Sequence, residues 1–400
     1  MKKRMSLAEV VPEMLPVPPV KGGAVETLVY DLAMELKRKY DVTVVSRPSG
    51  SKRKDGIRYI YIPESRIDRA LYALKKNSSR KNPIRHLAKA QNVYFYAMRA
   101  AKAMGNRFDV IHVHNDPNMI PLIRKYNPES IILLHMHNDH LVDSRMLRGR
   151  YSGILGMVDL VLCVSDYIRN RIVAEYPQAD AKCITLHNGV DVKRFRDYGA
   201  ASDSKVRSEL GIGKSKMVLY TGRLIPEKGV HILIKAMKRL LKKFPDSKLV
   251  ICGSSWFGDE SKTPYIRELE QLSMEIKNNV IFTGYIPQEK LARIYSAADL
   301  FVCPSIWPEP FALVCLEALA SCTKTVMTRV GGITESVPRD YPYIAEPGSP
   351  QSLAKKMIAA LSQKSSSNGA YRARVVKYYS KEAFARKTDI VLRNARRIRK

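Results

Sequence analysis

Two glutamates that follow a short apolar strand in the second half of the chain are the first candidates for binding chemistry. Leu300–Cys303 has the composition of a buried strand, and the loop after it contains Glu309 before an apolar helix that carries Glu317. A helix that opens directly after Glu309 would place this carboxylate beside unpaired backbone N–H groups. Glu317 lies two turns further on among leucines, where an unpaired carboxylate is costly. Ribose-like hydroxyls would satisfy it; exposure on a helix surface would explain either glutamate alone, but not both.

A basic turn follows the strand predicted for Met217–Tyr220. Arg223 and Lys228 lie in this turn between Gly222 and Gly229. An arginine binds phosphate oxygens through two parallel N–H groups, and a lysine supplies a compact positive charge. Together they would neutralise a diphosphate and stabilise it as a leaving group, although a solvated basic loop would have the same composition.

A glycine pair precedes a helix near the start of the chain. Gly22 and Gly23 lie between a predicted first strand, Met5–Val11, and a helix that begins near Ala24. Glycines at a helix N-terminus let the backbone approach an anion, and the helix dipole favours negative charge there. The alternative is a flexible turn without a ligand.

Two His-x-His pairs end consecutive strands of the first half. His112 and His114 end one strand, and His135 and His137 end the next. A metal site would need a further ligand at a recognisable spacing, and the sequence contains none, so we expect no bound metal. Imidazoles at strand ends beside a cleft would instead hydrogen-bond a substrate. His137, followed by Asn138, is the candidate in this half.

The elements that position these residues alternate between strand and helix in both halves. Such alternation is typical of α/β domains with parallel sheets and crossover helices. We predict two tandem doubly wound domains, 1–195 and 196–378, followed by a basic helix, 379–400, that packs on the first domain. In such folds ligands bind at the carboxyl ends of the strands, which would face one another across an interdomain cleft.

The chain of 400 residues carries a formal net charge of +30, which implies an anionic partner. The positive charge concentrates in residues 52–107 and 372–400. Arg80, Lys81 and Arg85 lie on or near first-domain helices that also carry apolar residues such as Leu87 and Val93, a pattern that favours an anionic membrane surface. A nucleic acid would also be anionic, but the sequence contains no recognition-helix motif or aromatic stripe, so we expect none.

Other features limit the location of the protein. No run of about 18 uncharged apolar residues is present, which excludes a spanning helix. The basic N-terminus is followed by Glu9, Glu13 and several prolines, which interrupt a signal peptide. The six cysteines form no CxxC pair and indicate reduced, buried thiols. We therefore expect a cytoplasmic protein, peripheral on the inner face of the cell membrane.

Taken together, these motifs resemble the GT-B glycosyltransferases of family GT4, over nearly the whole chain. Some segments are similar to lipopolysaccharide-core N-acetylglucosaminyltransferases, and others to a spore-coat relative of the same family. The shared motifs are Gly22-Gly23, Asn188-Gly189-Val190-Asp191, the pair Arg223 and Lys228, Glu309-x7-Glu317, and Gly331-Gly332.

The resemblance implies a retaining, metal-independent hexosyltransferase whose donor binds mainly to the second domain. Arg223 and Lys228 would bind the diphosphate, Glu309 the sugar hydroxyls and Glu317 the ribose. The donor would be a nucleotide sugar, with UDP-N-acetylglucosamine as the first choice. The acceptor would be a surface glycan such as lipopolysaccharide core, or a lipid-linked saccharide.

Further residues acquire roles from the resemblance alone. His137 would touch the donor sugar and stabilise charge at its anomeric carbon, and Gly23 would pack against the phosphate and the acceptor. The remaining residues assigned to the donor pocket are Phe311, Leu313, Gly331 and Gly332. One departure concerns the end of the Glu317 helix, where Cys322 and Lys324 replace the usual Gly and Pro, which leaves the turn there without its glycine.

Two other classes of function remain open at this point. A non-catalytic coat or assembly protein could retain the same fold, although the intact Arg223, Lys228, Glu309 and Glu317 argue against it. A nucleotide-sugar epimerase on the same two-domain fold is the alternative among enzymes.

Overall fold

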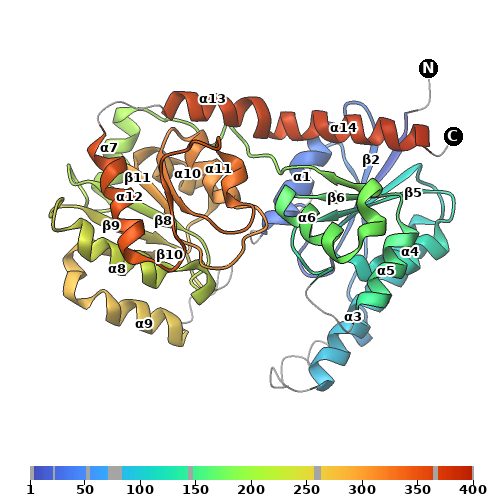
Figure 1. Cartoon of the computed structure of the whole chain (residues 1–400). Helices are drawn as coiled ribbons and strands as arrows, with labels where there is room; N and C mark the ends of the chain where they lie inside the picture. Colours follow the sequence, from blue (N-terminus) through green and yellow to red (C-terminus); the bar gives the residue numbers. More distant parts are fainter. Residues whose placement is uncertain are drawn as a thin grey trace. The chain divides into compact units, whose positions relative to one another are not determined.

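The computed structural model describes residues 4–20, 23–50, 55–70, 83–142, 147–255, 263–363 and 368–398, of which 83–92, 368, 397 and 398 by their backbone only. The chain forms two compact units (Figure 1). The first comprises the residues up to Leu186 and those from Ala385 onward; the second comprises His187–Phe384. The division predicted at residues 195 and 196 lies slightly further along the chain than the one observed.

The described part of the first unit is built on a seven-stranded parallel sheet of order β3-β2-β1-β4-β5-β6-β7. Its central strands are buried and mostly apolar, as expected of parallel strands covered on both faces. The order reverses between β1 and β4. The strands are β1 (Ser6–Val10), β2 (Asp41–Ser46), β3 (Arg58–Tyr61), β4 (Val110–His114), β5 (Ile131–Met136), β6 (Leu160–Cys163) and β7 (Cys183–Thr185).

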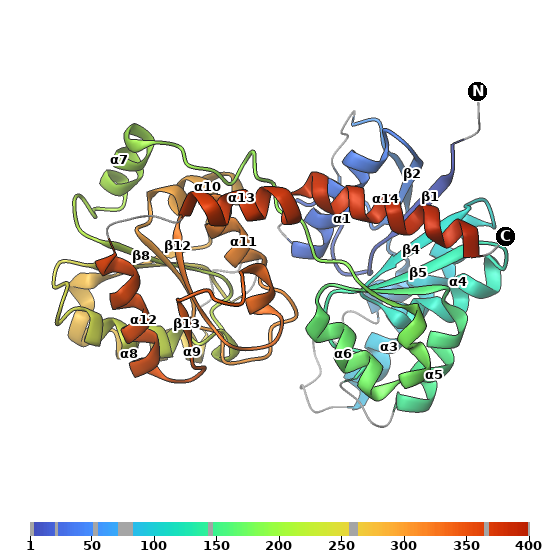
Figure 2. The same cartoon turned by 45° about the horizontal axis from the view of Figure 1, so that its top comes forward.

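The C-terminal helix α14 (Lys381–Ile398) lies beside α1 (Ala24–Leu36) in both views (Figures 1 and 2). Asp389 of α14 accepts hydrogen bonds from Lys39 Nζ at 2.7 Å and from the Tyr40 hydroxyl at 2.6 Å, just after α1. The other named helices of this unit are α3 (Pro83–Met104), α4 (Ile120–Tyr126), α5 (Arg148–Met157) and α6 (Asp166–Glu175).

In the second unit the described residues form a six-stranded sheet of order β10-β9-β8-β11-β12-β13, again parallel throughout. The strands are β8 (Met217–Thr221), β9 (Lys248–Cys252), β10 (Val280–Gly284), β11 (Leu300–Cys303), β12 (Lys324–Thr328) and β13 (Ile344–Ala345). The helices are α7 (Ala200–Glu209), α8 (Val230–Leu240), α9 (Pro264–Leu272), α10 (Gln288–Ala297), α11 (Leu313–Ala320), α12 (Pro350–Ser362) and α13 (Asn368–Tyr379).

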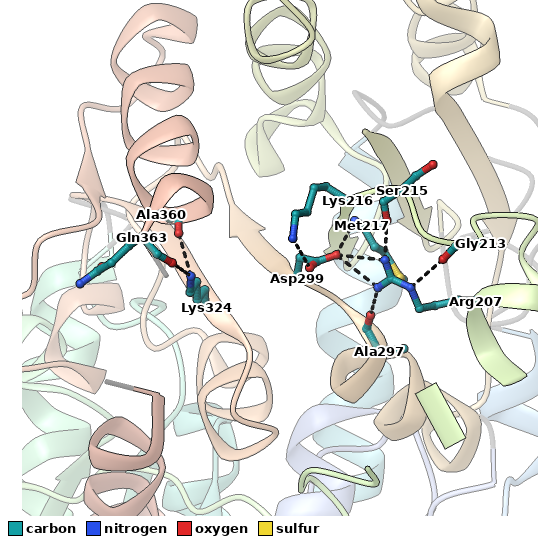
Figure 3. Close-up of polar contacts among 10 residues, drawn as sticks. All are labelled: Arg207, Gly213, Ser215, Lys216, Met217, Ala297, Asp299, Lys324, Ala360 and Gln363. Carbon is teal, nitrogen blue, oxygen red and sulfur yellow. Dashed lines mark hydrogen bonds and ion pairs between the residues drawn. The ribbon is translucent and has the colours of Figure 1, made fainter. Parts of the chain in front are cut away.

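The predicted fold class, α/β with two doubly wound domains, is confirmed by these sheets. Helix α7 was not predicted, because its sequence is mostly polar. A guanidinium and a carboxylate hold this helix to the sheet (Figure 3). Arg207 donates to Asp299 at 3.1 Å and to the carbonyl of Ala297 at 2.6 Å, and Asp299 also accepts from the backbone N–H of Met217 at 2.8 Å. One carboxylate oxygen of Asp299, Oδ2, thereby joins α7 to the first residue of β8.

The turn after α11 is closed by a cysteine in the position that usually requires glycine. Cys322 has a left-handed backbone with φ of 60°. Its N–H donates to Leu319 O at 3.2 Å, and the N–H of Thr323 donates to Ala318 O at 3.0 Å, the two bonds of a Schellman motif. Lys324 then starts β12 and donates from Nζ to Ala360 O and Gln363 O (Figure 3). The helix therefore ends normally despite the missing glycine.

We predict that Cys322→Gly stabilises the second unit by about 1 kcal/mol, because a β-carbon is disfavoured in the left-handed region. Both tryptophans of the chain fall within the sequence range of this unit, His187–Phe384, so tryptophan fluorescence in urea reports its unfolding. Cys322→Ala keeps the β-carbon and is the matched control. Equal stability of the Gly and Ala variants would contradict the prediction.

Among the helices that the structure describes, none combines the length and the apolar character needed to cross a membrane.

Candidate functional site

The turn after β8 and the loop after β11 are locked together at the carboxyl ends of their strands. The N–H groups of Ile306 and Trp307 donate to Glu227 O at 3.0 and 3.3 Å. Gly229 has φ of 69°, and a β-carbon there would overlap the carbonyl oxygen of Pro304. The glycine is therefore needed for the two segments to touch, and their contact fixes the position of Lys228.

The structure brings together Lys228 and Glu309, which were predicted as separate binding groups. Glu309 Oε1 accepts from Lys228 Nζ at 2.5 Å and from Ser305 Oγ at 2.8 Å. The side chains of Lys228 and Glu309 are 25% and 10% exposed, so water screens the pair incompletely. Ser305, which the sequence analysis did not single out, orients the carboxylate. The pair can present one positive charge and one acceptor to a ligand from fixed positions.

The glycines after β12 hold the backbone of Glu309. Gly331 has φ of 55°, and a β-carbon there would overlap Glu309 O and lie 2.7 Å from Glu309 N. The N–H of Gly332 donates to Glu309 O at 2.7 Å. Gly331 and Gly332 were expected to line a pocket for the base or the phosphate. In the structure they pack against the residue that carries the carboxylate, so three strand-end segments meet at Glu309.

The predicted position of Glu309 at the entrance of a helix is wrong. Helix α11 begins only at Leu313, and its N-cap is Ala312, whose side chain makes no cap hydrogen bond. The prolines on both sides of Glu309 keep the loop extended, and the carboxylate turns to Lys228 instead of to the helix N–H groups. Phe311 is buried, with its ring 5.3 Å from that of His187 and 6.1 Å from that of Tyr379, whereas Leu313 is half-buried.

Glu317 is buried as its apolar surroundings suggested, but its partner is a protein side chain. The hydroxyl of Tyr295, on α10, donates to Glu317 Oε2 at 2.9 Å. The same hydroxyl lies 2.5 Å from Thr221 Oγ1 at the end of β8. Burial raises the pKa of Glu317 to about 7, against the weaker lowering effect of the hydrogen bond from Tyr295. A ligand hydroxyl is therefore not needed to satisfy this oxygen.

Arg223 lies in the turn between β8 and α8 and has an exposed side chain. The turn itself is fixed: the Tyr220 hydroxyl donates to Arg223 O at 2.9 Å, and the N–H of Leu224 donates to Ser254 O at 2.9 Å. A β-carbon at Gly253 would overlap Gly222 O, so the ends of β8 and β9 are in close contact. The backbone of Arg223 is thus rigid, and its guanidinium can reach toward a ligand.

In the first unit, the surroundings of Gly23 differ from those of the predicted anion site. Gly23 has φ of 114°, and a β-carbon there would overlap the Glu26 carboxylate. Burial raises the pKa of Glu26. The carboxylate thus occupies the space beside Gly23 where an anion was expected, whereas Gly22 lies outside the described residues. A role of Gly23 toward phosphate stays a prediction.

His137 follows β5 and is half-buried. Its Nε2 lies 3.1 Å from Nδ1 of His114, the last residue of β4. The roles predicted for His137 toward a donor sugar stay predictions, since the structure contains no ligand. Of the predicted membrane-facing residues, Arg80 and Lys81 lie outside the described part, and only the backbone of Arg85 is described.

The pKa of Glu317 generates a test of its burial. Burial raises the pKa of its carboxyl from 4.5 to about 7 in the folded chain. The folded state therefore binds the proton more tightly, so stability is lost as the pH rises from about 4.5 to 7. Glu317→Gln cannot ionise. We predict that the stability of this variant relative to wild type increases by about 2 to 3 kcal/mol between pH 5 and pH 8.

The measurement is urea unfolding followed by tryptophan fluorescence at each pH. Glu275→Gln is the control, because the side chain of Glu275 is 78% exposed. Parallel pH profiles for wild type and Glu317→Gln would show that the carboxyl is not buried as described.

Two family models match the chain, one in each half. The model described as Glycosyl transferases group 1 matches residues 202–382, and the model described as Glycosyltransferase Family 4 matches residues 22–194. The first match contains the β8 turn, the β11 loop and the glycines after β12.

Individual proteins are similar over most of their length. Spore coat protein SA of Bacillus subtilis (strain 168) is 32% identical over 341 residues, which cover 83% of each chain. The lipopolysaccharide 1,2-N-acetylglucosaminetransferase of Salmonella typhimurium (strain LT2) is 26% identical over 387 residues, 94% of this chain and 95% of the relative. Among solved structures, HepE of Anabaena in complex with UDP superposes with a TM-score of 0.77 at 18% identity, covering 98% of this chain and all of that one.

Proposed function

Because the chain belongs to the group 1 glycosyltransferases of family 4 and has their GT-B fold, we propose that this hexosyltransferase binds a nucleotide-diphosphate sugar at the carboxyl ends of β8 and β11. The observation that carries the proposal is the Lys228–Glu309 pair, 2.5 Å apart and held by Gly229 and Gly331. A fixed cation beside a fixed acceptor suits a ligand in which a phosphate adjoins sugar hydroxyls.

Charge compensation is the main requirement of the transfer. When the bond between the anomeric carbon and the diphosphate oxygen breaks, its electron pair leaves with the nucleoside diphosphate. The acceptor hydroxyl oxygen bonds to the same carbon and gives its proton to the departing diphosphate oxygen. Arg223 and Lys228 would offset the charge that develops on the leaving group. We propose that these two side chains suffice without a metal ion at the donor site. Retention of configuration and the role of His137 at the anomeric carbon are part of the proposal.

Binding of the phosphate changes the role of the ion pair. In the structure Lys228 is engaged by Glu309. A diphosphate would compete for the ammonium group and leave Glu309 to accept hydrogen bonds from the sugar, with Ser305 as its remaining partner. We propose that this exchange couples binding of the diphosphate to recognition of the sugar.

The donor and acceptor are proposed from the relatives. HepE was solved with UDP, and the Salmonella relative is an N-acetylglucosaminetransferase that acts on lipopolysaccharide. We propose UDP-N-acetylglucosamine as the donor and a surface glycan, either lipopolysaccharide core or a lipid-linked saccharide, as the acceptor.

A thermal-shift panel of nucleotide sugars tests the donor site. We expect UDP-N-acetylglucosamine to raise the melting temperature of the wild type, and Lys228→Ala and Glu309→Ala to lose most of this response. Removal of a charged hydrogen-bonding partner costs about 2 kcal/mol, or roughly 30-fold in affinity.

Gly331→Ala provides a sharper variant, because it displaces the Glu309 backbone without removing the carboxylate. Gly348→Ala is its matched control: Gly348 has φ of 71°, but a β-carbon there would meet no atom within 4 Å. We expect donor binding to weaken in Gly331→Ala only. Equal responses of the two variants, or no stabilisation of the wild type by any nucleotide sugar, would refute the assigned site.

We propose, in addition, that the first unit binds an anionic membrane surface. The net charge of +30 supports this, as does the composition of α3, which has no acidic residue in its first turn and an exposed Lys102 near its end. A lipid-linked acceptor would be presented at such a surface.

Sedimentation with vesicles that contain anionic lipid tests the membrane proposal. We expect salt-sensitive binding that the charge reversal of Arg80, Lys81 and Arg85 to Glu weakens at least about 100-fold, since each basic residue contributes about 1 kcal/mol. Reversal of Arg239, Lys242 and Lys243, three exposed cations of the second unit, removes the same charge and serves as the control. Equal loss in both variants would indicate a response to net charge alone.

A further inference from the structure

Three histidines and a glutamate gather on one face of the sheet in the first unit. His112 and His114 alternate along β4, so both side chains point to the same face. Glu9 of β1 pairs in register with His112, and His135 of β5 pairs in register with His114. All four residues are fully buried. We refer to Glu9, His112, His114 and His135 as the histidine cluster.

The cluster contains a carboxylate whose charge is compensated only by imidazoles. Glu9 Oε2 lies 2.7 Å from His114 Nε2 and 3.0 Å from His112 Nδ1. Among the described residues, these two histidines are its ion-pair partners, and no lysine or arginine approaches it. A buried carboxylate is stable only with a counter-charge or several hydrogen bonds.

His112 is the member whose polar atoms the protein leaves unsatisfied. Neither of its ring nitrogens has a hydrogen-bond partner with proper geometry among the described residues, and the same holds for Oε1 of Glu9. Leaving a buried polar atom without a partner costs about 1 to 3 kcal/mol, and native proteins rarely do so without an ion or a water molecule. Nδ1 of His112 lies 3.0 Å from Glu9 Oε2, but the geometry of this contact does not meet that of a hydrogen bond.

We propose that His112, His114 and His135 bind a divalent transition-metal ion, with Zn²⁺ as the reference ion and Glu9 as the carboxylate that balances its charge. One ring nitrogen from each histidine lies within 4.8 Å of the other two. Zinc–nitrogen bonds of about 2.0 Å place tetrahedral ligands about 3.4 Å apart, so the rings would draw inward by roughly 1 Å. Rotation about the side-chain bonds provides a movement of this size.

The donor set selects the class of ion. Three imidazoles and one carboxylate suit zinc, cobalt, nickel or copper, whereas magnesium and calcium prefer sites made of oxygen atoms. The ion would also add two positive charges next to Glu9 and bind one of the two unsatisfied ring nitrogens of His112. One ligand would thereby compensate the buried carboxylate and give His112 a partner.

The ion would also fix His114 in one tautomer. If Nε2 of His114 faces the ion and Glu9, its Nδ1 carries the proton and donates to His137 Nε2, 3.1 Å away. The half-buried His137 would then be held in place by a buried metal. The metal site itself does not rest on the proposed donor site, which lies on the second unit.

Metal analysis of the full-length chain without an affinity tag tests the proposal. Because the cluster is fully buried, the ion must be supplied while the protein folds, so the chain is expressed in minimal medium with added Zn²⁺ or Co²⁺. We expect about one ion per chain after gel filtration, and visible ligand-field absorption of the cobalt form with the intensity of a four-coordinate site. His112→Gln combined with His135→Gln should bind less than about one tenth of an ion.

His140→Gln is the matched control, because His140 is an exposed histidine on the loop after β5. It should bind the ion as the wild type does. Absence of bound metal from the wild type, or equal metal content in the double variant, would overturn the proposal and leave a hydrogen-bonded histidine network. If the double variant fails to fold, the metal content and cobalt spectrum of the wild type still decide the question.

Discussion

The close approach of three backbone segments around Glu309 is the constraint on which the second unit depends. The turn after β8 reaches the β11 loop because residue 229 has no β-carbon, and the turn after β12 reaches the same loop because residue 331 has none. Only then can Lys228 and Glu309 meet at 2.5 Å. An ion pair of this exposure contributes little stability by itself, since desolvation opposes the attraction. The glycine contacts therefore set the geometry of the ion pair, which the pair alone could not do.

A second set of polar contacts, made by the buried Tyr295 hydroxyl, supports this geometry. The Tyr295 hydroxyl connects Glu317 on α11 with Thr221 at the end of β8. These hydrogen bonds join α11, the helix after β11, to β8, the strand that precedes the basic turn. They lie in the apolar core, where hydrogen bonds are strong and unsatisfied groups are costly. The tyrosine makes it possible to keep a carboxylate there, and burial holds the pKa of Glu317 near 7.

The sequence was sufficient to predict the elements, because parallel strands covered on both faces form continuous apolar runs. The strand Leu300–Cys303 was predicted to the residue, and Met217–Tyr220 ends one residue before β8 does. Partners were not predictable, because they come from distant parts of the chain. Glu309 and Lys228 are 81 positions apart, and nothing in the local sequence indicates that Tyr295 would satisfy Glu317. Helix α7 was missed because Arg207 and Asp299, rather than an apolar stripe, hold it in place.

The same reasoning shows what the sequence could have revealed about the histidines. His-x-His places both rings on one face of a strand, and consecutive parallel strands are often neighbours in a sheet. The third ligand was sought by spacing along the chain, whereas β4 and β5 bring it in across the sheet. Glu9 was interpreted as a residue that interrupts an apolar segment. In the structure it lies on β1 in register with His112 and is the buried carboxylate of the histidine cluster.

Both groups of polar residues lie at the same topological position. The order of the first sheet reverses between β1 and β4, and that of the second between β8 and β11. At such a point the crossover connections leave in opposite directions, which opens space at the carboxyl ends of the strands. Glu9 and His114 lie near these ends in the first unit, and Lys228 and Glu309 follow them in the second. In the first unit the polar groups belong to the strands themselves and are buried on one face of the sheet. In the second unit the polar groups come from the loops beyond the strands and stay partly exposed, which is the arrangement that a ligand requires.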